Sequence, residues 1–563
     1  MVLDLSTATD PPSTPGEPAG SPAISGKEVL LAAAVGLLLA VATNIPLLPH
    51  LSTHVPIGLS DPLLQAWQVA WNGHALLHQP AHPFDTNAFW PLKDTLAFSD
   101  ALLGYAPLGL IGSGVTAAIV RYDLLHILSS ALAYVGAYLL ARELGVRPWA
   151  AAMAGVAFAY APWRFSQANH LNILSSGGIP LSLFLLVRGA KRGRPWQVFT
   201  GFLVATWQVS LGFVLGLPFL YLLAGLGVLF GVRLVRRPRP SIRRRVVIAG
   251  AVGAAVLVST SALLALPYAR SADLYPEATR TVAEVEFFST PKRGFLAAPD
   301  GNLVWGALTR PMRDRLPWPN EQTTFPGVAI AALAAVGVVR GRHRAVALGL
   351  TVVAAGTAVL CLGFHLVNGV LGYRVLYEYM PGWDRIRVPG RLMVFTTLAL
   401  ALLASMGADH LLQRRRGSGG GALAAALAGL VLIEGVGILD VRRIPEPPAD
   451  LDRLEAPRLH LPMSAPNVFM LWSTEDFAPI VNGHSGIVPE QVQRAIEVSV
   501  TFPDAASVTY FRDVGVGTVV WHRALAEGTL WAAAGERPVD GLDLCRRVTA
   551  ELVIFELGGD GAC

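Results

Sequence analysis

The chain contains an unbroken apolar run, VIAGAVGAAVLVSTSALLAL, that extends from Val247 to Leu266. A helix of about 20 such residues is long enough to cross the ~30 Å hydrocarbon core of a bilayer. Comparable blocks extend from Leu30 to Leu48 and from Val346 to Leu362. Because a helix satisfies its backbone hydrogen bonds within the bilayer, these blocks predict an all-α polytopic membrane protein.

The composition agrees with this fold class. Hydrophobic residues make up 53% of the chain, charged residues only 15%, and the mean hydropathy is +0.48. A soluble domain carries about 25% charged residues. The block at Leu30 is too long for a cleaved signal peptide, and further blocks follow it. Residues 1–26 are rich in Pro, Ser, Thr and Gly, which predicts a disordered cytoplasmic tail.

Short basic segments predict the orientation of the spans. They lie at residues 142–147, 188–194, 233–245, 340–344 and 414–416. Cytoplasmic loops are enriched in Lys and Arg, so an even number of spans should separate successive segments. This predicts about eleven transmembrane helices in the plasma membrane, with the N-terminus in the cytoplasm and the C-terminus outside. The spans lie at 28–48, 123–142, 148–161, 171–188, 197–213, 216–232, 246–267, 325–340, 345–363, 391–412 and 421–438.

The predicted transmembrane domain, residues 27–438, has outer loops at 50–122, 162–170, 268–324 and 365–390. The apolar stretch 101–120 is interrupted by glycines and a proline. We therefore expect a broken amphipathic or re-entrant helix at the outer interface rather than a twelfth span. Positive charge lies in short segments between spans, which argues against a nucleic-acid partner.

The C-terminal part, residues 439–563, predicts a small α+β extracytoplasmic domain. Apolar residues alternate with others at 517–521 and 548–557, a pattern typical of strands. Two states are open for Cys545 and Cys563: free thiols, or a disulfide, which an extracytoplasmic location permits.

Asp61 stands in the first outer loop, directly before Pro62 and a segment with Trp67, Trp71 and His74. A carboxylate near a bilayer is costly to desolvate, which makes Asp61 a candidate for chemistry. A second interpretation treats Asp61 as the N-cap of a helix that Pro62 opens. The tryptophans can equally belong to an interfacial aromatic belt. Spacing alone leaves these interpretations open.

The layout resembles the GT-C superfamily of membrane glycosyltransferases, including YfhO-like bacterial proteins. An Asp-bearing outer loop follows the first span, and further similar stretches follow in order. They are YAPL at 105–108, YLLARELG at 138–145, AFAYAPWR at 157–164, MPGWDRIRVPGR at 380–391 and VNGHSGIVP at 481–489. The resemblance implies sugar transfer from a polyprenyl-phosphate donor, with membrane lipid as a further partner.

The resemblance also implies functions for particular residues. Asp61 would be the base, or would help to hold a divalent metal ion. The leaving lipid phosphate needs cationic partners, and arginine binds phosphate with a bidentate fork. The candidates for this contact are Arg164, His170, Arg385, Arg387 and Arg391. The alternative for the arginines is snorkelling toward lipid headgroups.

Many superfamily members carry a second acid in the second outer loop, but residues 164–170 contain none. The remaining candidates are Asp85, Asp100, Glu284 and Glu286. Glu284 and Glu286 share a face only if their segment is extended. A metal site at His74, His78 and His82 is disfavoured because Pro80 interrupts the helical spacing.

The function expected from these observations is transfer of a sugar to an envelope glycan, lipid or protein acceptor on the outer face. One alternative is a transporter or flippase for a lipid-linked sugar, which needs polar residues inside the spans; Gln208 and Glu434 are the candidates. Another is a non-catalytic envelope-assembly protein on the same scaffold. A transporter would move its substrate without forming a glycosidic bond.

Overall fold

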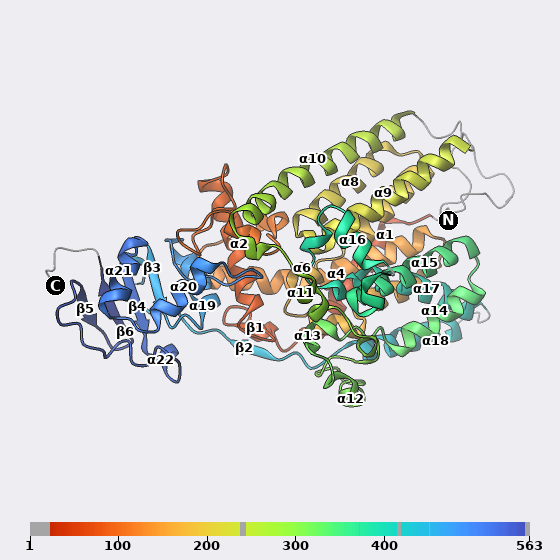
Figure 1. The fold of residues 1–563 in the computed structure, drawn as a ribbon. Coiled ribbons are helices and arrows are strands. Elements are labelled where there is room, and N and C mark those ends of the chain that lie inside the picture. Colours follow the sequence, from red (N-terminus) through yellow and green to blue (C-terminus); the bar gives the residue numbers. More distant parts are fainter. Residues whose placement is uncertain (1–22, 237–243, 371, 414–417, 450, 558–563) are drawn as a thin grey trace. The chain divides into compact units, whose positions relative to one another are not determined.

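The computed structural model describes residues 23–236, 244–370, 372–413, 418–449 and 451–557 (Figure 1). Most of the predicted disordered tail and Cys563 lie outside the described residues. The chain divides into two compact units. The first unit comprises residues up to Leu48, Leu125–Leu263 and Arg280–Leu439, and the second comprises Pro49–Leu124, Leu264–Thr279 and residues from Asp440. The boundary falls inside helices α4 and α10, and each unit is described by itself.

The first unit consists of helices. They are α1 (Gly26–Thr43), α4 (Gly114–Glu143), α5 (Pro148–Ala159), α6 (Leu171–Leu174), α7 (Gly178–Arg192), α8 (Pro195–Ser210), α9 (Phe213–Arg236), α10 (Arg244–Leu274), α11 (Val282–Phe288), α12 (Arg310–Arg313), α13 (Pro319–Gln322), α14 (Val328–Arg340), α15 (Arg344–Cys361), α16 (Tyr373–Tyr379), α17 (Met393–Gln413) and α18 (Ser418–Gly435). Two 3-10 turns, Pro162–Gln167 and Pro389–Leu392, carry residues of the candidate site.

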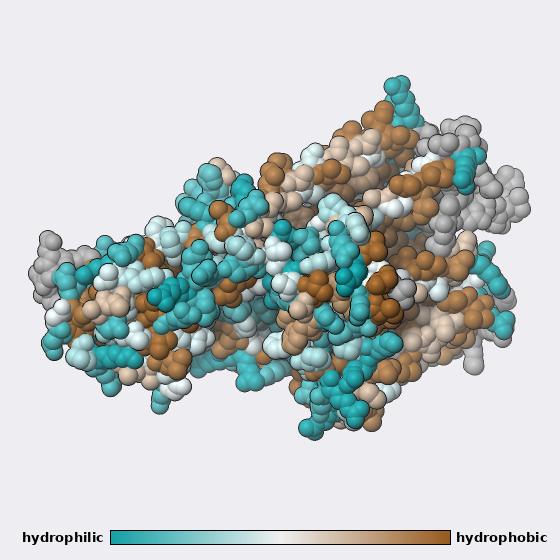
Figure 2. All heavy atoms as spheres, viewed as in Figure 1, coloured by the Kyte–Doolittle hydropathy of each residue, from teal (hydrophilic) through white to brown (hydrophobic). Residues whose placement is uncertain are grey.

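Among the described residues, seven helices are long and apolar enough to cross a membrane, and three shorter apolar helices accompany them. Hydrophobic side chains cover α9 and the first part of α10 (Figure 2). The prediction of a multi-pass helical membrane protein is therefore confirmed. Each predicted span lies on a helix, although the span 171–188 is split into α6 and α7.

The predicted broken element at 101–120 is only partly right. A 3-10 turn, Leu103–Tyr105, and the short helix α3, Ala106–Gly109, form its first half. Residues 114–120 are instead the first turns of α4. Two glycines in left-handed conformations, Gly112 and Gly114, separate the two parts, since few other residues adopt a positive φ without strain.

Helix α17 is the most buried of the apolar helices and packs against α5, α14 and α15. It crosses α14 at two glycines. A Cβ atom on Gly337 would lie 2.0 Å from the Leu403 carbonyl oxygen, and one on Gly407 would lie 2.0 Å from the Leu333 oxygen. Small residues permit such close helix approach in membrane proteins. This contact requires glycine on both helices.

Ion pairs join helices near the predicted cytoplasmic ends. Arg142 Nε lies 2.6 Å from Glu28 of α1, and Arg188 Nη1 lies 2.6 Å from Glu143 of α4. Arg147, which precedes α5, lies 2.7 Å from Asp409 of α17. In each pair the carboxylate and the guanidinium come from different segments, so these contacts form only when the helices have assembled.

The second unit contains the sheets. Its helices are α2 (Asp61–His78), α3, α19 (Pro466–Trp472), α20 (Glu490–Ser499), α21 (Ala505–Asp513) and α22 (Arg523–Ala526). Strands β1 (His54–Pro56) and β2 (Val441–Arg443) pair antiparallel. Strands β3 (Arg458–Leu461), β4 (Thr518–His522), β5 (Cys545–Val548) and β6 (Leu552–Glu556) form a mixed sheet in the order β3-β4-β6-β5. The expected C-terminal sheet is therefore present.

Candidate functional site

The first unit gathers charged side chains that are far apart in the sequence. His170 follows the 3-10 turn Pro162–Gln167, Glu321 lies in α13, and Arg391 lies in the turn that leads into α17. With Arg280 and Arg387 they form what we call the cationic cluster: His170, Arg280, Arg387 and Arg391 around the carboxylates of Glu321 and Glu284.

Glu321 organises one side of the cationic cluster. Its carboxylate lies 2.6 Å from Nη2 and 3.3 Å from Nε of Arg391, and 3.5 Å from Nε2 of His170. The Gln167 amide donates a further hydrogen bond of 3.3 Å. Burial alone would raise the pKa of Glu321, but the charges of Arg391 and His170 outweigh it and lower that pKa below its ordinary value. The carboxylate is therefore held in its charged form.

Arg387 and Arg280 form the other side. The Arg387 guanidinium stands 4.8 Å from the centre of the Phe288 ring, and burial followed by repulsion from Arg391 lowers its pKa. Arg280 pairs with Glu284 at 2.9 Å, and burial lowers its pKa as well. Three arginines thus face two carboxylates in a partly buried place. An anion bound there would relieve the repulsion between the arginines.

Two of the predicted phosphate-binding residues, Arg164 and Arg385, lie outside the cationic cluster. Arg164 is buried and donates hydrogen bonds to Ala159 O, Ser176 Oγ and Leu174 O at 2.9–3.2 Å. Burial lowers its pKa to about 10. Arg385 is more exposed and pairs with its neighbour Asp384 at 3.2 Å. Of the predicted cations, His170, Arg387 and Arg391 are the ones that surround Glu321.

Asp61 belongs to the second unit and is the first residue of α2. The N-cap is Ser60, one residue earlier than the capping interpretation expects, and its side chain makes no capping bond. The Asp61 carboxylate interacts electrostatically with the buried Tyr122, which in turn interacts with Asp123. Asp123 is fully buried, and neither carboxylate oxygen has a hydrogen-bond partner among the described residues. Tyr122 therefore interacts with two acids, Asp61 and Asp123, and the sequence interpretation did not consider Asp123.

The tryptophans after Asp61 are core residues. Trp67 and Trp71 are only 2% and 3% exposed, and their indole N–H groups bond to Asn87 Oδ1 and Pro83 O at 3.1 and 2.9 Å. The belt interpretation is therefore wrong for these two residues. They fix α2, and with it Asp61, on the loop that follows.

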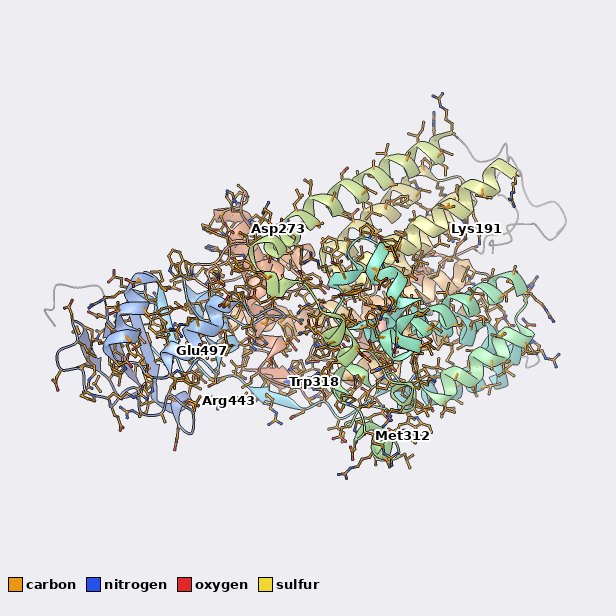
Figure 3. All side chains as sticks on the ribbon, viewed as in Figure 1. Lys191, Asp273, Met312, Trp318, Arg443 and Glu497 are labelled. Carbon is orange, nitrogen blue, oxygen red and sulfur yellow. The ribbon has the colours of Figure 1, made fainter. Side chains whose placement is uncertain are left out.

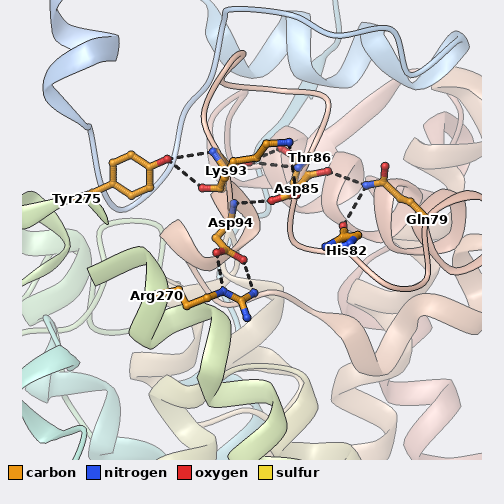
Figure 4. Close-up of polar contacts among 9 residues, drawn as sticks. Gln79, His82, Asp85, Thr86, Lys93, Asp94, Arg270 and Tyr275 are labelled. Carbon is orange, nitrogen blue, oxygen red and sulfur yellow. Dashed lines mark hydrogen bonds and ion pairs between the residues drawn. The ribbon is translucent and has the colours of Figure 1, made fainter. Parts of the chain in front are cut away.

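Asp85 stabilises the fold of that loop (Figure 4). Its carboxylate accepts the Asp94 backbone N–H at 2.8 Å and lies 3.6 Å from Lys93 Nζ. Asp94 in turn makes two bonds with Arg270, of 2.8 and 2.9 Å. These contacts give Asp85 a structural function in the loop, and its assignment as a second acid stays a prediction. Asp100 is half-buried, and its carbonyl accepts a bond from the Gln68 amide.

Glu284 and Glu286 lie in a helix, α11, not in an extended segment. Their side chains therefore point in different directions, because successive helical residues are about 100° apart. Glu284 joins the cationic cluster, whereas Glu286 is exposed.

A divalent metal ion needs several ligands. Within the described ranges, no group of three or more His, Cys, Asp or Glu side chains is arranged to hold one. His74 and His78 stack their rings at 4.3 Å instead. Cys361 is buried, and Cys545 lies in β5.

The sequence interpretation missed Arg280, Glu321 and Asp123. Asp123 carries a usable signal, because it is an ionisable residue inside an apolar segment. Arg280 and Glu321 carry none: both lie in a long polar loop, and their partners are remote in sequence.

Neither a protein-family model nor a curated protein matches the sequence. Solved structures are nevertheless similar. The arabinofuranosyltransferase AftD from Mycobacteria matches with a TM-score of 0.51 and 14% identity over 97% of this chain and 41% of that chain. A mutant of AftD gives 0.53 and 15% over 96% and 42%. The oligosaccharyltransferase AglB from Archaeoglobus fulgidus gives 0.46 and 13% over 88% and 69%.

The chain spans about two fifths of the length of AftD. At this identity the likeness concerns the fold alone, and it agrees with the resemblance found in the short motifs. The chain has the fold of the GT-C membrane glycosyltransferases.

Proposed function

We propose that the chain is a membrane glycosyltransferase that moves a sugar from a polyprenyl-phosphate donor to a cell-envelope acceptor on the outer face of the plasma membrane. The observation that carries the proposal is the cationic cluster, which combines three arginines and a histidine in a partly buried place. A lipid phosphate is an anion that fits such a place, and guanidinium groups suit its oxygens.

In the proposed reaction, the oxygen of an acceptor hydroxyl forms a bond to the anomeric carbon of the donor sugar. The bond from that carbon to the phosphate oxygen breaks, and the lipid phosphate keeps the electron pair. Arg387 and Arg391 stabilise the negative charge that develops on it. A base must accept the proton of the acceptor hydroxyl. The family resemblance implies Asp61 for this function; Asp61 belongs to the second unit and the cationic cluster to the first, so the two assignments are separate proposals. The positive-inside pattern predicts that Arg387, Arg391 and Asp61 each lie in a segment on the outer side of the membrane.

The transporter alternative depends on polar residues inside the spans, and its two candidates differ in their surroundings. Glu434 accepts the Ala329 backbone N–H at 2.8 Å, at the start of α14, and the Trp305 indole N–H at 3.1 Å. It therefore caps a helix, as an acidic side chain at a helix N-terminus does. Gln208 is buried, with an exposed fraction of 1%. The contacts of Glu434 assign it to the helix start rather than to a transport path, whereas the burial of Gln208 does not distinguish the two functions.

The test uses the purified full chain in lipid nanodiscs, with radiolabelled polyprenyl-phosphate sugars and an envelope glycan extract as acceptor. We expect label to pass into the acceptor fraction, and Arg391→Ala to abolish the transfer. Glu286→Gln, which changes an exposed carboxylate on α11, serves as control. Movement of labelled lipid across the bilayer without a new glycosidic bond would favour the transporter instead, and absence of both activities would favour the assembly protein.

A further inference from the structure

Three aromatic rings contact one another, and one of them, Phe288, also contacts Arg387 of the cationic cluster. Phe287 and Phe288 end α11, and Trp318 directly precedes α13. The Phe287 and Phe288 ring centres are 5.0 Å apart, and the Trp318 ring lies 6.3 and 6.2 Å from them. We call these three residues the aromatic trio. Trp318 is labelled in Figure 3.

One buried amide holds the aromatic trio together. Gln322 has no exposed surface. Its Nε2 donates to Phe287 O and Ser289 O at 2.7 and 3.0 Å, and its Oε1 accepts the Trp318 backbone N–H at 3.0 Å. Both segments that carry the aromatic trio are therefore fixed before any ligand arrives, which is a property of built binding sites.

Helix α13 joins the aromatic trio to the cationic cluster. Its adjacent residues Glu321 and Gln322 hold Arg391 and the aromatic trio, respectively. Arg387 provides a second link, because its guanidinium lies over the Phe288 ring at 4.8 Å. The two groups of residues are therefore held together by shared contacts.

The aromatic trio presents apolar surface although it stands next to charge. Phe287 is 45% exposed and Trp318 is 47% exposed. Exposed apolar groups that are rimmed by polar residues can mark a ligand-binding site. The face of an aromatic ring carries partial negative charge. It therefore attracts the weakly positive C–H groups that cover one face of a sugar ring.

We propose that the aromatic trio is the subsite for the sugar ring of the donor, while the cationic cluster holds the phosphate. The inference rests on the proposed function and names the part of the site that binds the sugar. In a glycosyl phosphate, a single oxygen separates the anomeric carbon from phosphorus. A sugar ring whose phosphate lies at Arg387 must therefore lie within a few ångströms of that arginine, and the Phe288 ring meets this condition.

A lipid-facing aromatic belt is the competing explanation for exposed tryptophans. Trp149 and Trp196 illustrate it: each follows the proline that begins α5 or α8, next to a basic segment, and they are 71% and 59% exposed. These two residues serve as controls because they stand beside basic segments on the predicted cytoplasmic side and are even more exposed than Trp318.

The experiment is a ³¹P NMR titration of the full chain in detergent. The probes are inorganic phosphate, methyl phosphate and the 1-phosphates of glucose, mannose, galactose and arabinofuranose. We expect at least one sugar phosphate to bind more tightly than methyl phosphate. Trp318→Leu, which keeps the apolar character but removes the π face, should weaken that binding about three- to tenfold. The same substitution should leave the affinity for methyl phosphate unchanged.

Trp318→Phe should recover most of the affinity, and Trp149→Leu should have no effect on any probe. The proposal is overturned if every sugar phosphate binds like methyl phosphate, or if Trp318→Leu leaves the preference intact. Failure of the proposed function would give a different result. If Arg391→Ala bound inorganic phosphate and methyl phosphate as tightly as the wild type does, the cationic cluster would not be the phosphate site.

Discussion

Glu321 forms a bidentate contact with Arg391: its two carboxylate oxygens accept hydrogen bonds of 2.6 Å from Nη2 and 3.3 Å from Nε. A two-point contact fixes the plane of the guanidinium as well as its position. The same carboxylate lies 3.5 Å from His170. One buried acid therefore positions two cations that come from different parts of the chain, and this relationship leads to the first predictions.

Replacement of Glu321 by glutamine should destabilise the protein. It removes the charge that compensates Arg391 and His170, and breaking a buried pair costs about 3–5 kcal/mol. Added phosphate should restore part of the loss, because an anion relieves the same repulsion. Thermal unfolding with and without phosphate measures both effects. Glu286→Gln should unfold at the same temperature as the wild type. If phosphate stabilised Glu321→Gln no more than it stabilises the wild type, the compensation of charge by phosphate would be contradicted.

The contribution of Glu321 should also depend on pH. Its pKa is lowered in the folded state, so the contribution is complete above the ordinary value of 4.5 and is lost as the pH falls through the lower folded value. The stability difference between the wild type and Glu321→Gln should therefore be constant near neutrality and shrink in acid. A difference that grows toward acid would show that the pKa is raised instead.

Arg164 and Arg387 should respond differently to mutation. Arg164→Ala leaves the buried carbonyls of Ala159 and Leu174 without their donor, at about 1–3 kcal/mol each. It should lower the unfolding temperature. Arg387→Ala should instead weaken donor binding about 10–100-fold with little change in unfolding temperature. Comparison of the two variants in both assays separates a structural arginine from a phosphate contact.

Asp61→Asn should lower the transfer rate about 10²–10⁴-fold, the usual contribution of a general base. Ser60→Ala is the control, because it alters the N-cap of the same helix and leaves the carboxylate in place. If Asp61 served only the start of the helix, Asp61→Asn would reduce stability and would not change the transfer rate of the folded protein.

The crossing of α14 and α17 should not tolerate a methyl group. Gly337→Ala and Gly407→Ala each place a Cβ atom 2.0 Å from a carbonyl oxygen, so the helices must separate. We expect a loss of about 1–3 kcal/mol or more. Gly356→Ala in α15 meets nothing within 4 Å and should be neutral or slightly stabilising. Unfolding of the three variants in detergent measures the contrast.

The positions of the long apolar helices can be predicted from the sequence, because a run of apolar residues is a local signal. A block such as 247–266 predicts a span by length alone, and α10 covers it. His170, Arg387 and Arg391 were also recognised, because they lie in short outer segments with distinctive neighbours. Local signals failed for α11, where Thr281 accepts the Glu284 N–H at 3.2 Å and begins a helix that the polar composition conceals.

Glu321 could not be found in this way. Its importance comes from partners 70 residues later in the chain and in a separate turn before α6. Such pairs depend on how the outer loops fold back on the helices. The periodicity of hydrophobic residues along the sequence carries no information about that. Asp123 is different, because an ionisable residue within an apolar segment is a signal that the sequence itself carries.

The ion pairs of Arg142, Arg147 and Arg188 have a consequence for biogenesis. Their carboxylate partners, Glu28, Asp409 and Glu143, lie on other segments, so the pairs are absent while the helices enter the membrane one after another. During that stage the arginines are unpaired and can direct each helix, since acidic residues contribute little to orientation. Once the bundle closes, the same charges become interhelical contacts. We therefore expect this set of arginines to act twice, first as an orientation signal during insertion and later in ion pairs between the assembled helices.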